Sequence, residues 1–197
     1  MKKILLIATI LFVAVVSTAC INNLAVQDLN NKAQTYLEQG DYKQAIERLK
    51  SSLDLDANVF ETHYNLAIAY SKNENYIEAI NEYQKALELK PNFSQIYYSL
   101  ATTQYNVALD IEKANLAVDE NGNLYKPNKE EYVPEKGEVE MEVQLAPKEF
   151  DYMNKMYSDS LSNYTKYLEL NPNAKEKEEI EKQINKISEI LKYNNVN

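Results

Sequence analysis

The chain has 197 residues, which is enough for one domain with additional segments. It carries 21 Lys and Arg against 30 Asp and Glu. The resulting formal charge of -9 repels phosphate backbones and argues against a nucleic-acid partner. A single cysteine, Cys20, permits neither an internal disulfide nor a multi-cysteine metal site.

The N-terminus has the three-part layout of an export leader. A short positive region at Lys2-Lys3 is followed by the apolar run Ile4–Val16 and by small residues up to Cys20. The apolar run is shorter than the roughly 20 residues that a membrane-spanning helix needs, which argues against an uncleaved anchor. Small residues directly before a cysteine resemble the lipobox of bacterial lipoproteins, although Ser17 stands where that family usually has Leu.

This resemblance implies a leader over residues 1–19, an acylated Cys20 and a tether over residues 20–25. It also implies export to the bacterial cell envelope and attachment to a membrane by lipid. Because Ile21 rather than Asp follows the cysteine, the family's sorting pattern favours the outer membrane where the host has one. The alternative is that Cys20 is an ordinary small residue near a general cleavage site.

Residues 60–93 carry a 34-residue pattern of small and aromatic side chains. Small residues allow two helices to pack closely where they cross, and a proline ends the second helix. The pattern resembles the tetratricopeptide repeat (TPR), a helical hairpin that buries its apolar face against neighbouring repeats. The packing positions in this stretch are Leu66, Ala67, Tyr70, Ala79, Tyr83, Ala86 and Pro91.

Two further repeats flank this one. In residues 26–59, Gly40 suits the left-handed position that ends a helix, and Asp41 can cap the next helix. The third repeat is split into residues 94–108 and 156–174, so the TPR domain spans 26–174, and an amphipathic helix over 175–197 caps the array. The packing positions of these two repeats are Ala33, Tyr36, Ala45, Leu100, Ala101, Tyr164 and Pro172.

An insertion over residues 109–155 interrupts the third repeat. Leu109, Ile111 and Ala114 continue the apolar stripe of the preceding helix, and Phe150 and Met153 extend the following one backwards. Asn121-Gly122 predicts a β-hairpin between Leu116–Val118 and Leu124–Tyr125. The strict alternation over Glu138–Leu145 predicts a half-buried strand. The predicted fold is therefore an all-α TPR array of about three repeats with a capping helix and a small antiparallel β insertion.

The first helices of TPR hairpins line a concave groove in this family. Amide and tyrosine side chains there offer both donors and acceptors to an extended peptide. Asn65 matches an asparagine of the carboxylate clamp found in some relatives, but Asn30, Gln95 and Ser99 stand where its other members would be, which disfavours that clamp. The predicted groove residues are Gln27, Asn30, Gln34, Tyr64, Asn65, Ile68, Tyr98, Thr102 and Tyr105.

No motif for catalysis, metal binding or a cofactor is evident. His63, the only histidine, occupies a repeat packing position, and Asp119–Asn123 is interpreted as a turn rather than a calcium loop. We therefore expect a membrane-anchored, non-enzymatic protein-interaction scaffold, adaptor or assembly factor with a protein partner and no small-molecule substrate. The alternative is a module that binds the cell wall or a glycan through exposed tyrosines.

The lipid anchor gives a first prediction. Substitution Cys20→Ser should abolish incorporation of radiolabelled fatty acid and release the protein from membranes, because each buried methylene of an acyl chain contributes about 0.8 kcal/mol to attachment. Failure of the label to enter the wild-type protein would rule out lipidation.

Overall fold

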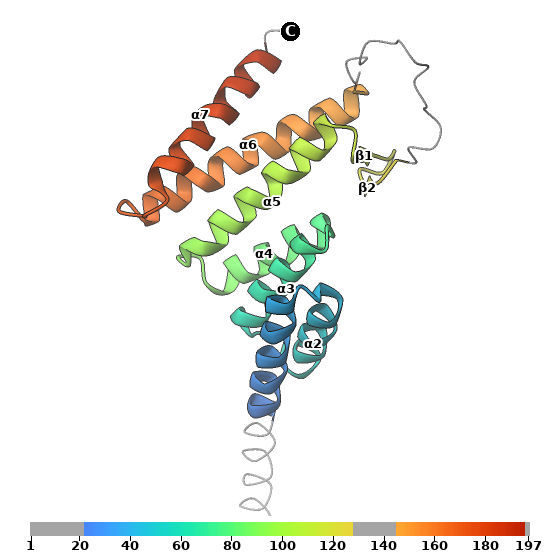
Figure 1. Cartoon of the computed structure of the whole chain (residues 1–197), viewed down its shortest axis with the longest axis vertical. Coiled ribbons are helices and arrows are strands. Elements are labelled where there is room, and N and C mark those ends of the chain that lie inside the picture. The colour runs from blue at the N-terminus through green and yellow to red at the C-terminus, as the bar shows by residue number, and fades with distance from the viewer. Residues whose placement is uncertain (1–21, 128–144, 196–197) are drawn as a thin grey trace, which may run out of the picture. The chain divides into compact units, whose positions relative to one another are not determined.

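The computed structural model describes residues 22–127 and 145–195 (Figure 1), and the chain divides into two compact units between Pro91 and Asn92. We call the units N and C. Unit N contains a helix over residues 22–39, followed by α2 (Tyr42–Leu55), α3 (Phe60–Lys72) and α4 (Tyr76–Leu89). Unit C contains α5 (Ser94–Glu112), β1 (Ala117–Val118), β2 (Leu124–Tyr125), α6 (Pro147–Leu170) and α7 (Lys177–Asn194).

The turn of the first hairpin in unit N forms at the two residues that the sequence indicates. Gly40 has a φ of 75°, and Asp41 N donates back to the Tyr36 carbonyl at 2.9 Å. The Asp41 side chain then accepts from Gln44 N at 3.1 Å and caps α2. In the second hairpin the left-handed position is taken by Glu74, whose φ of 61° is uncommon for a residue with a side chain.

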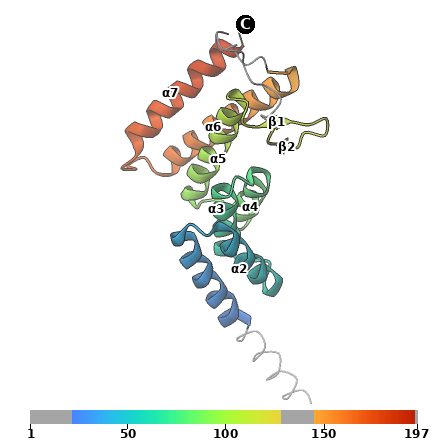
Figure 2. The same ribbon diagram turned by 45° about the vertical axis from the view of Figure 1, so that its right-hand side comes forward.

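The core of unit N is built on small side chains. Ala33 and Ala45 are fully buried and pack with Leu49, Leu66 and Ala69 where the helix over 22–39, α2 and α3 meet (Figure 2). Partly buried side chains, including Tyr36 and Tyr70, complete this cluster. Between α3 and α4, Ala67 and Ala79 are also fully buried, so these helices have no room for larger side chains at those positions.

In unit C the long helices α5 and α6 form a hairpin, and α7 lies along α6 (Figure 1). Ser160 donates to the Ala101 carbonyl at 2.8 Å, and the hydroxyls of Thr102 and Tyr164 share a hydrogen bond at 3.0 Å. On α7, Ile180 and Ile187 are buried while most other side chains are exposed. The last helix therefore presents a largely polar outer face, as a terminal cap requires.

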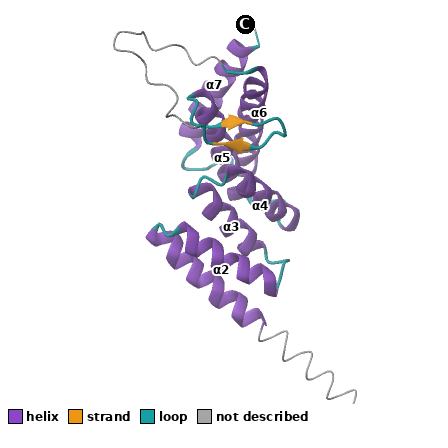
Figure 3. Ribbon diagram, turned by 90° about the vertical axis from the view of Figure 1, so that its right-hand side faces the viewer, coloured by secondary structure: helices purple, strands orange, loops and turns teal. Residues whose placement is uncertain are grey.

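A two-stranded antiparallel hairpin follows α5 (Figure 3). Ala117 pairs with Tyr125 and Val118 with Leu124, which confirms the predicted β insertion. Gly122 has a φ of 84° in the connecting turn, where Asp119 accepts hydrogen bonds from the backbone amides of Asn121 and Asn123.

Two details differ from the sequence analysis. Residues 22–25, assigned there to a tether, already belong to the first helix because Val26 is buried in unit N. Ala114 does not continue α5, because Asn115 N bonds to the Asp110 carbonyl at 2.7 Å and Ala114 takes a φ of 51°. The predicted strand over 138–145 lies outside the described residues except for its last residue, which precedes α6.

The close helix crossing in unit N gives a second prediction. Ala79→Leu should destabilise the protein by about 1–3 kcal/mol through overpacking of the fully buried site. The matched control Gln84→Leu, at an exposed position of the same helix, should change the free energy of unfolding by less than about 0.5 kcal/mol. Thermal melts with the reverse order would contradict the assigned crossing.

Candidate functional site

The residues predicted to pack the repeats lie in or around the cores of the two units. Tyr36 and Tyr70 are partly buried, and the exposed Pro91 and Pro172 lie two residues after the ends of α4 and α6. The remaining predicted packing residues are buried: Ala33, Ala45, Leu66, Ala67, Ala79, Tyr83, Ala86, Leu100, Ala101 and Tyr164.

Unit N contains an open cavity of about 500 Å³ between the start of the helix over 22–39 and the start of α3. We call it the amide cavity because four of its lining side chains are amides. It brings together two predicted groove residues, Gln27 and Asn30, with Glu61, which also falls at a groove position of the repeat, and with four residues outside that pattern. The full lining is Asn23, Val26, Gln27, Asn30, Asn31, Val59 and Glu61.

Asn30 is held in place within the amide cavity by hydrogen bonds to three neighbours. Its Nδ2 lies 2.9 Å from the Val26 carbonyl, from Ser52 Oγ on α2 and from Thr62 Oγ1 on α3. Ser52 and Thr62 are fully buried. Asn30 Oδ1 is buried and has no partner within the described chain. Asn30 was expected only as a groove residue, but it also joins three helices.

Glu61 contributes the one acidic side chain of the amide cavity. Lys90 Nζ donates to Glu61 Oε1 at 2.9 Å and lies 4.1 Å from the centre of the Phe60 ring. The hydrogen bond from Lys90 lowers the pKa of the Glu61 carboxyl below its ordinary value, although partial burial acts in the opposite direction. Among the lining residues there is neither Lys nor Arg.

His63 is a buried structural residue rather than a reactive one. Its Nδ1 lies 2.6 Å from Glu82 Oε2, and its Nε2 lies 2.9 Å from the Ala57 carbonyl oxygen. A carbonyl oxygen only accepts, so Nε2 must donate to it. With both ring nitrogens engaged and the ring buried, His63 has no free nitrogen for a metal or a substrate.

The other predicted groove residues of unit N are not among those that line the amide cavity. Gln34 is exposed and donates to Glu38 at 3.0 Å. Tyr64 is partly buried, with its ring parallel to that of Phe60 at 6.0 Å between centroids. Asn65 and Ile68 are also partly buried on α3.

In unit C the three predicted groove residues follow one face of α5. Tyr98 is 39% exposed, and its ring lies 5.9 Å from Tyr164 and 5.4 Å from Tyr167. Thr102 bonds to Tyr164, as described above, and Lys186 of α7 donates to Tyr105 at 2.8 Å. Burial alone would raise the pKa of Tyr105, but its interactions with Lys186 and Gln183 together outweigh burial and lower that pKa.

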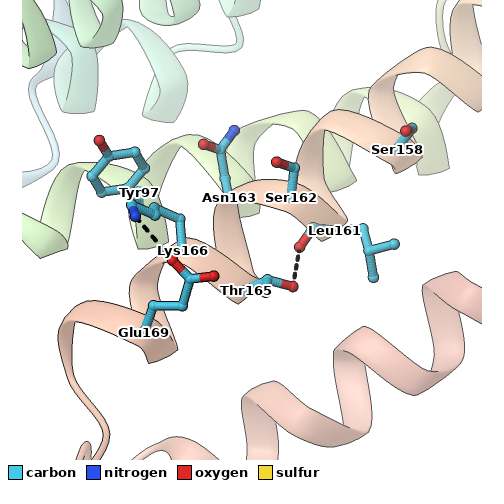
Figure 4. A pocket seen from close by; sticks show the side chains of 8 residues that line it. All are labelled: Tyr97, Ser158, Leu161, Ser162, Asn163, Thr165, Lys166 and Glu169. Atoms are coloured by element: carbon cyan, nitrogen blue, oxygen red, sulfur yellow. Dashed lines mark hydrogen bonds and ion pairs between the residues drawn. The ribbon is translucent and has the colours of Figure 1, made fainter.

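Unit C also has an open cavity of about 480 Å³ on α5 and α6, which we call the hydroxyl cavity (Figure 4). Lys166 pairs with Glu169 at 2.9 Å, and Thr165 donates to the Leu161 carbonyl at 2.9 Å. Tyr97 lines this cavity, although it also fits a packing position of the repeat pattern. The lining residues are Tyr97, Ser158, Leu161, Ser162, Asn163, Thr165, Lys166 and Glu169.

Two kinds of feature are absent from the described ranges. Over residues 22–127 and 145–195, no three His, Cys, Asp or Glu side chains are grouped so that they could hold a metal ion. Within the same ranges, no helix combines the length and apolar character needed to cross a membrane.

Comparison with known proteins supports the repeat assignment. A sequence model described as tetratricopeptide repeat matches residues 60–93, and a second, described as TPR repeat, matches residues 33–74. No curated protein sequence matches this chain.

Solved structures share the fold. The first TPR of Spaghetti (RPAP3), bound to the HSP90 peptide SRMEEVD, is 17% identical, covers 85% of this chain and 94% of its own, and has a TM-score of 0.56. The TPR2B domain of yeast Sti1, in a complex named for pHsp70, is 18% identical, covers 84% of this chain and 98% of its own, and has a TM-score of 0.52. The Sgt2 TPR domain from Aspergillus fumigatus is 12% identical, covers 87% of this chain and 82% of its own, and has a TM-score of 0.51. The fold is thus an all-α TPR array with a small β insertion.

The ion pair beside the amide cavity gives a third prediction. Lys90→Gln should raise the pKa of Glu61 toward its ordinary value, measured by NMR titration of the carboxyl carbon. Because the folded pKa is depressed, the pair stabilises the protein above the ordinary carboxyl pKa, and this contribution is lost as pH falls through the folded pKa. Both partners are about half exposed or more, so the contribution should stay below about 1 kcal/mol.

The matched control for this titration is Lys72→Gln, because Lys72 is exposed near the end of the same α3 helix that carries Glu61. It should leave the Glu61 titration where it is in the wild-type protein. An unchanged Glu61 titration in Lys90→Gln would contradict the assignment of Lys90 as the cause.

Proposed function

We propose that this chain is an exported, lipid-anchored protein-interaction scaffold of the bacterial cell envelope, acting as an adaptor or assembly factor. It binds an extended segment of a partner protein. The observation that carries the proposal is the amide cavity of unit N, where Asn23, Gln27, Asn30 and Asn31 project from one helix toward a single space. The lipobox-like sequence that ends at Cys20 supports the anchor.

The chemistry of the amide cavity suits a peptide main chain. Each amide side chain offers a donor and an acceptor, as each peptide unit does. Gln27 and Asn31 are exposed, so their polar atoms are accessible to a ligand. Val26 and Val59 add apolar surface for a side chain of the bound segment. Amides with a small apolar contribution therefore favour an uncharged extended segment.

Among the structural neighbours, this fold holds peptides. The ligand that we expect for the amide cavity nevertheless differs in charge from the peptide that is bound by one of these neighbours. The TPR of Spaghetti (RPAP3) is bound to SRMEEVD, a peptide that ends in acidic residues. The amide cavity has no basic lining residue and contains Glu61. A strongly acidic peptide would therefore lack a cation there, so we expect an internal segment of the partner rather than an acidic C-terminus.

A second candidate function rests on the hydroxyl cavity of unit C. Tyr97 supplies an aromatic ring, and Ser158, Ser162 and Thr165 supply hydroxyls elsewhere in the lining of the same cavity. An aromatic face beside polar groups suits a sugar ring, which has both apolar and hydroxyl surfaces. This arrangement supports the alternative of a module that binds the cell wall or a glycan.

Photocrosslinking in the native host tests these proposals and gives a fourth prediction. We expect p-benzoylphenylalanine in place of Gln27 to form a light-dependent adduct with a partner protein. The same probe in place of Glu47, at an exposed position of α2, should form little or none. A third probe in place of Thr165 reports on the hydroxyl cavity.

Equal adduct yields at positions 27 and 47 would contradict a binding role for the amide cavity. Adducts at position 165 alone, with cell-wall material that glycan competes away, would support the second candidate in place of the first.

A further inference from the structure

Most of the residues that line the amide cavity are close in sequence to the proposed acylation site, Cys20. The helix that provides most of its lining begins at residue 22, so only Ile21 separates it from Cys20. Consecutive Cα atoms are 3.8 Å apart, so Asn23 lies at most about 11 Å from Cys20 in any conformation of the connecting residues. Asn31 is about 12 Å further along the helix. The whole lining of this helix therefore lies within about 23 Å of an acylated Cys20.

An acylated cysteine is held at the bilayer surface, where the headgroup layer of one leaflet is roughly 5–8 Å thick. The residues that the helix over 22–39 contributes to the amide cavity then lie within about 23 Å of this surface. A folded soluble partner would have to bring an extended segment to within about 23 Å of the bilayer surface. A segment that emerges from its own membrane anchor is already there at high effective concentration.

The lining argues against a lipid headgroup as the ligand. A lipid phosphate is stabilised by Lys or Arg, and none lines this cavity. Glu61 would repel the phosphate, and its neighbour Lys90 is already engaged by Glu61 and the Phe60 ring. Neutral amides remain as the main recognition groups, and Asn30 is held in a fixed orientation by Ser52 and Thr62.

We propose that the amide cavity binds the membrane-proximal segment of a partner protein anchored in the same bilayer. The bound segment is extended, carries no net negative charge and directly adjoins the partner's own lipid or membrane-spanning anchor. This inference rests on the proposed lipidation of Cys20 and on the proposed peptide-binding role of the amide cavity.

The test moves the cavity away from the membrane without altering it. A semi-rigid, mostly helical spacer of four EAAAK units, inserted between Ile21 and Asn22, adds about 30 Å where it is helical. The probe is p-benzoylphenylalanine in place of Gln27 in the full-length protein in its host, with fatty-acid labelling in parallel. The matched control carries the same spacer after Asn197.

Without the spacer, the adduct should map by mass spectrometry to a partner peptide within about ten residues of that partner's anchor. With the spacer, adduct yield should fall at least tenfold while acylation and the thermal melt are retained, and the control should keep the adduct. An undiminished adduct, a peptide far from any anchor, or an adduct with phospholipid would overturn the inference but leave the lipid anchor standing. Absence of acyl label, or of any adduct in the parental chain, would contradict the proposed function itself.

Discussion

Close packing at alanine positions is the constraint on which the structure depends. A helical hairpin holds together only if its two helices approach closely, and the approach is set by the smallest side chains at the crossing. Ala33, Ala45, Ala67 and Ala79 are all fully buried in unit N, and Ala101 is fully buried in unit C. Larger apolar and aromatic side chains then fill the space around each crossing, so the surfaces beyond the crossings are free to vary.

That variation gives the two units different surfaces on the same scaffold. Unit N places amides around an open cavity, while unit C has tyrosines along α5 and hydroxyl side chains around its own cavity. Both cavities are open and combine polar with apolar surface, and neither is a deep apolar pocket of the kind that binds small hydrophobic ligands. Except for the buried Val26, the residues that line the two cavities are exposed or partly buried.

The features that the sequence predicted well are those with local causes. Gly40 ends one helix because it tolerates a positive φ, and Asp41 begins the next because its side chain reaches the backbone amide of Gln44. Asn121-Gly122 forms a tight turn for the same kind of reason. These interactions span only a few residues, so their residue types alone indicate the structure.

The features that the sequence missed depend on distant partners. The role of Asn30 is set by Ser52 and Thr62, which lie 22 and 32 residues further along the chain. Tyr97 fits a packing position in the repeat pattern, yet it borders a cavity because of the α6 residues that lie opposite. Repeat periodicity placed Gln27 and Asn30 on the groove face of their helix. It did not indicate which of the predicted groove residues line the same cavity.

The hydrogen bonds of Asn30 have a consequence for how such a scaffold evolves. One amide joins the helix over 22–39 to α2 and α3 and also forms part of the cavity wall. A change at this position therefore alters stability and recognition together. Asn23, Gln27 and Asn31 are exposed on the same helix, so substitutions there alter the ligand surface at little structural cost. Partner preference can thus diverge through changes at the exposed residues Asn23, Gln27 and Asn31 while Asn30 stays the same.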